Sequence, residues 1–234
     1  MKQNKEFLLL WFSQSISQLG SSMTAFALTL WIYEKTHLAM SVSLLAFFRF
    51  TSFILMGIIA GKFVDKHSKK SIMLIADSIA AIGTLWVLIL FSYGRLDIGV
   101  IYIANIIVGA STAFQNPAAF VAVGKLVEKD RLAKASGLNS FSNYAIMIMS
   151  PILGAALYGF SSLTFVLVLD LICFLFAFIV LAFFINIPEN NVSELKISKK
   201  VGITDGFRFL FKQKGLLLVV LTIAIVNFFS RITY

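Results

Sequence analysis

Six runs of apolar residues, each about as long as a bilayer is thick, set the fold of this chain. A transmembrane helix needs about 20 mostly apolar residues. The runs cover residues 7–33, 40–63, 71–91, 98–116, 138–160 and 163–187. Hydrophobic residues make up 59% of the chain and charged residues 13%, about half the share in a soluble domain. The sequence therefore predicts an all-α integral membrane protein.

The sixth run is followed by a polar segment and then by another apolar one. Pro188 is expected to end the sixth helix, because proline clashes with the preceding turn. We expect a six-helix transmembrane domain over 1–188 and a basic cytoplasmic linker over 189–214, with an amphipathic segment at 207–212. Residues 215–234 would form an incomplete or minimal seventh span. Because the sequence stops within this apolar run, we expect a truncated fragment.

The positions of the basic residues predict the orientation. With the N-terminus in the cytoplasm, 16 of the 20 Lys and Arg residues fall in cytoplasmic segments, and only Lys35 and Arg95 fall in outer loops. Cytoplasmic loops of membrane proteins are enriched in Lys and Arg. This excess predicts a multi-pass protein of the plasma membrane with a cytoplasmic N-terminus.

Polar side chains recur on one face of the first run and on one face of the fourth. Gln14 and Gln18 are one helical turn apart, and Asn105 lies about three turns before Gln115 and Asn116. These stripes are candidates to line a substrate cavity near the membrane centre. The alternative is hydrogen bonding between helices, which membrane proteins use routinely.

Three charged residues lie within the apolar runs. Arg49 is about 15 Å into the second run, so it should face a cavity or a partner instead of lipid. It is a further candidate for the substrate site or for coupling, with a structural ion pair as the alternative. Asp170 is a candidate partner for Arg49. Asp77 is expected to reach toward the interface or to pair with loop lysines. A structural role is expected for both aspartates.

The loop after the second run carries a compact set of small and charged residues, Gly61, Asp65, Lys66, Lys69 and Lys70. The glycine would allow helix backbones to approach closely. The aspartate can lie at a helix N-terminus, and the lysines hold the turn in the cytoplasm. Taken alone, the segment could also be an ordinary basic turn.

The same loop resembles the signature Gly-x-x-x-Asp-(Arg/Lys)-x-Gly-(Arg/Lys)-(Arg/Lys) of the major facilitator superfamily. Ser68 replaces the second glycine, which puts a left-handed turn there in doubt. The resemblance implies the N-terminal six-helix half of that fold, made of two inverted three-helix repeats. It also implies that the loop is a cytoplasmic gate, and that transport runs by alternating access with a second half or a partner chain.

Three further stretches resemble the drug-exporter branch that includes macrolide efflux proteins. The first is residues 17–21 together with 30–36, the second is residues 109–118, and the third is residues 150–155. Pro151 and Gly154 match a weakened antiporter motif. Asn105 stands where proton-coupled exporters of this branch carry arginine, so a basic residue tied to the proton relay is missing. Protons and another coupling ion both remain as candidate partners. The resemblance implies secondary-active efflux of an amphipathic small molecule, such as a drug or a macrolide.

Other classes of function fit the sequence less well. His37 and His67 are the two histidines, and no Cys/His cluster or nucleotide-binding motif is present, so neither an enzyme nor a cofactor is expected. The basic residues fall between apolar runs instead of along one face, which argues against nucleic acid. A membrane channel, a sensor and a non-functional relic of a transporter remain as alternatives.

Overall fold

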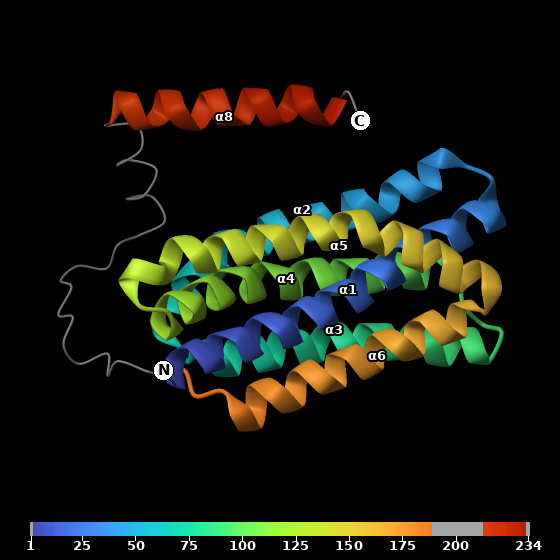
Figure 1. The fold of residues 1–234 in the computed structure, drawn as a ribbon. Helices are drawn as coiled ribbons and strands as arrows, with labels where there is room; N and C mark the ends of the chain where they lie inside the picture. The colour runs from blue at the N-terminus through green and yellow to red at the C-terminus, as the bar shows by residue number, and fades with distance from the viewer. Residues whose placement is uncertain (1, 189–212, 233–234) are drawn as a thin grey trace. The chain divides into compact units, whose positions relative to one another are not determined.

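The computed structural model describes residues 2–188 and 213–232 as two separate units (Figure 1). The first unit contains six long helices, α1 Lys2–Thr36, α2 Ala39–Lys66, α3 Lys69–Ser92, α4 Ile98–Leu126, α5 Leu132–Phe160 and α6 Leu163–Ile179. A 3-10 turn, Lys129–Arg131, precedes α5, and a π-helical turn, Val180–Phe184, extends α6. The second unit contains α8, Lys214–Ile232. No strand occurs in either described range.

Most of the helices extend beyond the apolar runs that predict them, and three helices begin directly after a capping residue. Ser68, Asp97 and Ser162 accept hydrogen bonds from the first backbone N–H groups of α3, α4 and α6. The end of the fourth helix was predicted wrongly at residue 116, since α4 continues through Pro117 to Leu126. The sixth helix ends at Phe184, before Pro188.

Five of the described helical segments are long and apolar enough to cross a membrane, namely α2, α3, α4, Lys129–Phe160 and Leu163–Phe184. Although α1 is 35 residues long, it is not among them. Its middle third is rich in serine and glutamine. The prediction that 7–33 crosses the membrane remains a prediction. So do the seventh span and the domain boundaries at 188 and 214, and the linker's amphipathic segment lies outside the described residues.

The helix pairs within the first unit follow a two-fold pattern. Helix α2 packs on α4 as α1 packs on α5, and α3 packs on α4 as α1 packs on α6. Exchanging α1, α2 and α3 for α4, α5 and α6 leaves these pairs unchanged. The predicted arrangement of two three-helix repeats accounts for this pattern.

Two apolar cores lie toward opposite ends of this bundle. One core includes Leu10, Met73 and Leu181. The other includes Ala27 and Leu167, which lie several helical turns away from Leu10 and Leu181. The segments between the two cores carry the polar residues of α1, α3 and α6. A polar layer is therefore enclosed between two apolar ones.

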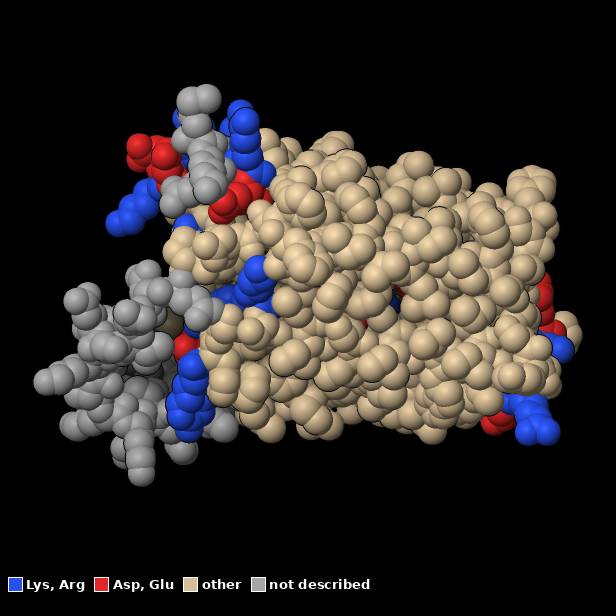
Figure 2. All heavy atoms as spheres, turned by 90° about the horizontal axis from the view of Figure 1, so that it is seen from below, with Lys and Arg blue, Asp and Glu red and all other residues tan. Residues whose placement is uncertain are grey.

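The outer surface has a matching distribution of charge. Figure 2 shows Lys, Arg, Asp and Glu gathered toward the two ends of the molecule. A broad uncharged band separates them, broken by a small opening in which charged atoms are visible. Large apolar side chains such as Ile54, Ile82 and Ile152 are exposed along the helices that form this band. A surface of this kind suits contact with lipid.

Gly109 of α4 determines how closely α4 approaches α2. A Cβ atom at Gly109 would lie 2.2 Å from the backbone oxygen of Arg49. Close to this contact, Ser52 donates a hydrogen bond of 2.7 Å to the backbone oxygen of Ile106. The absence of a side chain at Gly109 lets the two helices meet at this point.

We predict that Gly109→Ala destabilises the bundle by about 1–3 kcal/mol, because the added methyl group has no space against the Arg49 backbone. Thermal unfolding of the detergent-solubilised chain would measure the effect. Gly124→Ala is the matched control on the same helix, since no described atom lies within 4 Å of its Cβ position. Equal unfolding temperatures for the two variants would contradict the prediction.

Candidate functional site

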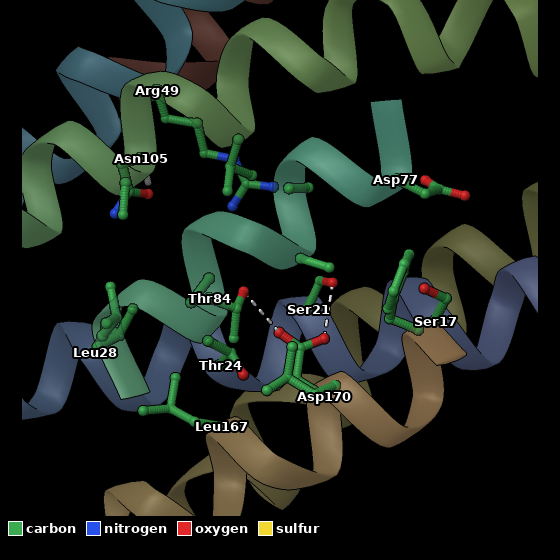
Figure 3. A pocket seen from close by; sticks show the side chains of 18 residues that line it. Ser17, Ser21, Thr24, Leu28, Arg49, Asp77, Thr84, Asn105, Leu167 and Asp170 are labelled. Carbon is green, nitrogen blue, oxygen red and sulfur yellow. Dashed lines mark hydrogen bonds between the residues drawn. The ribbon is translucent and has the colours of Figure 1, made fainter. Parts of the chain in front are cut away.

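A small cavity lies inside the first unit, in the polar layer between the two apolar cores. It is lined from five helices by Ser17, Ser21, Thr24, Ala25, Leu28, Arg49, Asp77, Ala80, Ala81, Thr84, Val87, Ala104, Asn105, Val108, Leu167, Asp170, Leu171 and Phe174. Figure 3 shows Arg49 entering from α2 and Asp170 from α6, with side chains of α1 and α3 between them. The space open to water-sized molecules is about 70 Å³.

Asp170 is the best-satisfied charged group in the cavity. Its side chain is buried, and its two carboxylate oxygens accept hydrogen bonds from Ser21 Oγ at 2.9 Å and Thr84 Oγ1 at 3.4 Å (Figure 3). Gly20 lets α1 approach α6 here, since a Cβ at Gly20 would lie 3.2 Å from Asp170 Oδ1. Hydrogen bonds from two other helices thus hold the carboxylate in place.

Arg49 faces the same cavity but forms none of the ion pairs found among the described residues. The predicted partner, Asp170, does not approach within the 4.0 Å of an ion pair, and the pair that is found joins Arg131 and Glu128 at 3.7 Å. The prediction of an Arg49–Asp170 ion pair is therefore wrong for this structure. Seryl and threonyl hydroxyls satisfy Asp170 instead, while the guanidinium group points into the open space (Figure 3).

Asp77 belongs to a second polar group beside the cavity. Gln14 Nε2 donates to Asp77 Oδ2 at 3.3 Å, and Gln115 Nε2 donates to Gln14 Oε1 at 3.1 Å. The expected pairing of Asp77 with loop lysines is not found among the described residues, because the side chain turns inward toward α1. Helices α1, α3 and α4 are joined by this chain of amides and carboxylate.

The predicted cavity residues divide into three groups. Arg49 and Asn105 line the cavity. Gln14 and Gln115 do not, but they connect to it through Asp77. Gln18 and Asn116 are exposed on the surface of this unit. Cavity-lining positions and interhelical hydrogen bonds thus both occur among these residues, and a substrate-binding role for all six remains a prediction.

Sequence reasoning did not include the hydroxyl groups around Asp170 among the site residues. Thr24 and Thr84 come from different helices, and single threonines in apolar runs give little signal in a sequence. Asp77 and Asp170 were expected to have structural roles, yet both line the cavity. The signal that could have identified them is the cost of any carboxylate inside a membrane span.

The predicted gate loop joins α2 to α3 and contacts the end of α6. Lys70 Nζ donates to the backbone oxygens of Ala182 and Ile185, both at 2.8 Å. Lys69 Nζ donates to the backbone oxygens of Asp65 and His67 at 3.3 and 3.1 Å. Lysine at a helix C-terminus satisfies carbonyl groups that have no partner within the helix.

Two details of this loop differ from expectation. Gly61 has no described atom within 4 Å of its Cβ position, so the predicted close approach of backbones there is wrong within the described residues. Ser68, which replaces a glycine of the signature, has a φ of −57° and needs no left-handed conformation. Its side chain instead caps α3 by accepting a hydrogen bond from Ser71 N at 3.4 Å. Asp65 and Lys66 are exposed, and the gating role of all five residues remains a prediction.

The antiporter-like residues lie within α5. Pro151 is inside this continuous helix. Gly154 packs against α1, since a Cβ there would lie 2.9 Å from the backbone oxygen of Met23. Gly154 therefore allows the α1–α5 approach, as Gly109 allows the α2–α4 approach.

We predict that Lys70→Met destabilises the bundle by about 1–3 kcal/mol, since two backbone oxygens at the end of α6 lose a charged donor. Amide hydrogen exchange at residues 180–187 should also become faster. Lys66→Met is the matched control, because Lys66 is exposed in the same loop and its side chain forms no hydrogen bond or ion pair with the residues that the structure describes. Unchanged exchange at 180–187 in Lys70→Met would count against the anchoring role.

Comparison with known proteins agrees with this architecture. Residues 10–234 match the model of the Major Facilitator Superfamily. Macrolide efflux protein A of Streptococcus pyogenes is 29% identical over 219 residues, which cover 92% of this chain and 54% of that protein. The protein of the same name from Enterococcus faecalis is 29% identical over 79% of this chain and 56% of its own length.

The lysophospholipid transporter LplT of Cronobacter sakazakii is 26% identical over 145 residues, or 62% of this chain and 34% of that protein. The chain thus spans about half the length of the macrolide efflux proteins that it matches. The family match covers nearly all of the sequence, and the all-helical membrane bundle fits it. The chain belongs to the Major Facilitator Superfamily of membrane transporters.

Proposed function

We propose that this chain is the N-terminal half of a secondary-active exporter of amphipathic small molecules that works by alternating access. The observation that carries the proposal is the family match over residues 10–234, together with similarity to macrolide efflux proteins along 92% of the chain. Macrolides and lysophospholipids, the compounds named for the relatives, are both amphipathic. This shared property supports the substrate class.

The size of the internal cavity supports a division of roles between two sites. Pockets for drug-sized ligands measure about 300–1,000 Å³. A space of about 70 Å³ holds water or a small ion, but not a macrolide. The substrate is expected to bind instead on a face that a second half or a partner chain completes. The exposed polar side chains of Gln18 and Asn116 are candidates for that face.

The proposed setting is the plasma membrane, with the N-terminus in the cytoplasm. In the bundle, the chain's first helix begins at the end where α2 meets α3 and α4 meets α5 (Figure 1). The basic residues around these junctions include Lys66, Lys70, Lys125 and Lys134. Positive charge concentrated at one end favours placing that end in the cytoplasm.

Efflux can be tested with two forms of the protein in an efflux-deficient bacterium. One is the chain alone, and the other is the chain joined to the remaining C-terminal part of Streptococcus pyogenes macrolide efflux protein A. We expect the joined form to lower accumulation of a radiolabelled macrolide, and collapse of the ion gradients across the membrane to abolish this effect. Accumulation equal to that of vector-only cells, at verified membrane levels of both forms, would contradict the proposal.

Arg49→Gln should remove most of the efflux by the joined form, because the cavity loses its positive charge while the side chain stays polar. Membrane insertion should be unchanged. Gln18→Ala tests the other site, and we expect it to alter affinity for the substrate more than the maximal rate. Efflux at the wild-type level by Arg49→Gln would contradict a role of the cavity in transport.

Asp65→Asn should impair efflux by the joined form without stopping membrane insertion, if the loop between α2 and α3 is the cytoplasmic gate. The reason is that a neutral side chain can no longer interact with a helix N-terminus through its charge. Lys62→Gln is a control at a nearby exposed position. Normal efflux by Asp65→Asn at normal expression would refute the gating role.

A further inference from the structure

The cavity is lined by more negatively charged side chains than positively charged ones. Its lining includes two carboxylates, those of Asp77 and Asp170, and one guanidinium group, that of Arg49. With all three ionised, the cavity carries one excess negative charge. An uncompensated charge inside a membrane protein is costly, so a bound cation would stabilise this arrangement.

Oxygen atoms converge on Asp170 from two other helices. Ser21 and Thr84 each donate a hydrogen bond to one of the two carboxylate oxygens. Carboxylate and hydroxyl oxygens are ligands of hard cations.

Thr24 supplies the independent sign of a missing ligand. Its side chain lines the cavity and is 6% exposed, yet its Oγ1 atom has no hydrogen-bond partner among the described residues. It lies beside the Asp170 carboxylate but lacks the geometry of a hydrogen bond (Figure 3). A buried hydroxyl without a partner costs about 1–3 kcal/mol, and a bound cation would use its lone pairs.

Other titratable groups near Asp170 do not take this role. Asp77 is engaged by Gln14, and its carboxylate lies apart from the Asp170 cluster (Figure 3). Cys173 lies one turn along α6 and is a free thiol. Arg49 faces the cavity from the opposite side, so it competes with a cation for Asp170 instead of binding one.

We propose that the cluster of Asp170, Ser21, Thr24 and Thr84 binds one Na⁺ ion. Two carboxylate oxygens and three hydroxyl oxygens are available, and the single formal charge of Asp170 suits a monovalent ion. Sodium sites in other transporters likewise lie near the membrane midplane, where helices meet. Asp170 is about 10 Å from the start of α6 by the helical rise per residue.

The site offers a link between ion binding and conformation. Arg49 and the ion cannot both approach Asp170 closely, because their charges repel. A bound ion would keep Arg49 away from Asp170, and only an empty site would let the two side chains form an ion pair. The ion would thereby bias the packing of α2 against α6. This coupling step rests on the proposed transport function, whereas ion binding does not.

Binding can be tested on the purified 234-residue chain in detergent, without any transport assay. Saturable binding of ²²Na⁺ would be measured by scintillation proximity, with choline chloride keeping the ionic strength constant. Thermal unfolding over the same NaCl range gives a second readout, since a ligand that binds the folded state raises its stability. We expect one saturable site that Na⁺ fills and choline does not.

Thr24→Val is the sharpest variant, because it removes the unpartnered hydroxyl while keeping the shape of the side chain. We expect it to fold at least as stably as the wild type and to bind Na⁺ about tenfold or more weakly, as loss of a ligating or supporting group does at other metal sites. Asp170→Asn should abolish binding, and Arg49→Gln should strengthen it. Thr112→Val is the matched control, since that hydroxyl donates to its own helix at Val108 O.

Three results would overturn the proposal. They are no saturable ²²Na⁺ binding by the wild-type chain, equal affinities of Thr24→Val and Thr112→Val, and stability that responds to pH but not to Na⁺. The last result would assign the excess negative charge to a proton. Sodium binding without efflux would instead leave this site in place and count against the proposed transport function.

Discussion

A charged side chain at the middle of a bilayer has no water around it, and the interior of this bundle meets that constraint with polar groups from neighbouring helices. Asp170 receives two hydroxyl groups from α1 and α3, and Asp77 receives an amide of α1. These bonds hold α1, α3 and α6 together at one level of the bundle. Apolar cores lie above and below that level.

Close helix contacts make this polar layer feasible. Hydroxyl groups are short, so the helices that carry them must come near the carboxylate. Gly20 brings α1 to α6, Gly109 brings α4 to α2, and Gly154 brings α5 to α1. In each case a Cβ atom would lie 3.2 Å or less from an atom of the facing helix. In this bundle the glycines therefore allow the close helix packing that complementary apolar side chains provide in a soluble core.

The small volume of the cavity distinguishes ion binding from substrate binding, which the sequence alone cannot do. Polar residues in membrane helices can bind a substrate, bind an ion or join helices. Here Gln14 and Gln115 join helices, the cavity beside Asp170 has room for water or a small ion, and Gln18 and Asn116 lie on the outer surface of the unit. The lysines of the loop between α2 and α3 also differ in their roles, since Lys70 anchors the end of α6 while Lys66 is exposed.

The sequence by itself determined the helical membrane class, the helix boundaries to within about ten residues, and the superfamily. Apolar run length and short signature motifs are local properties, so they can be read along the chain. Tertiary structure alone decided that Asp170 bonds to Ser21 and Thr84 instead of Arg49, and that Asp77 turns toward Gln14. Those choices depend on the rotation and spacing of helices distant in sequence, which glycine contacts set and which no single run of residues encodes.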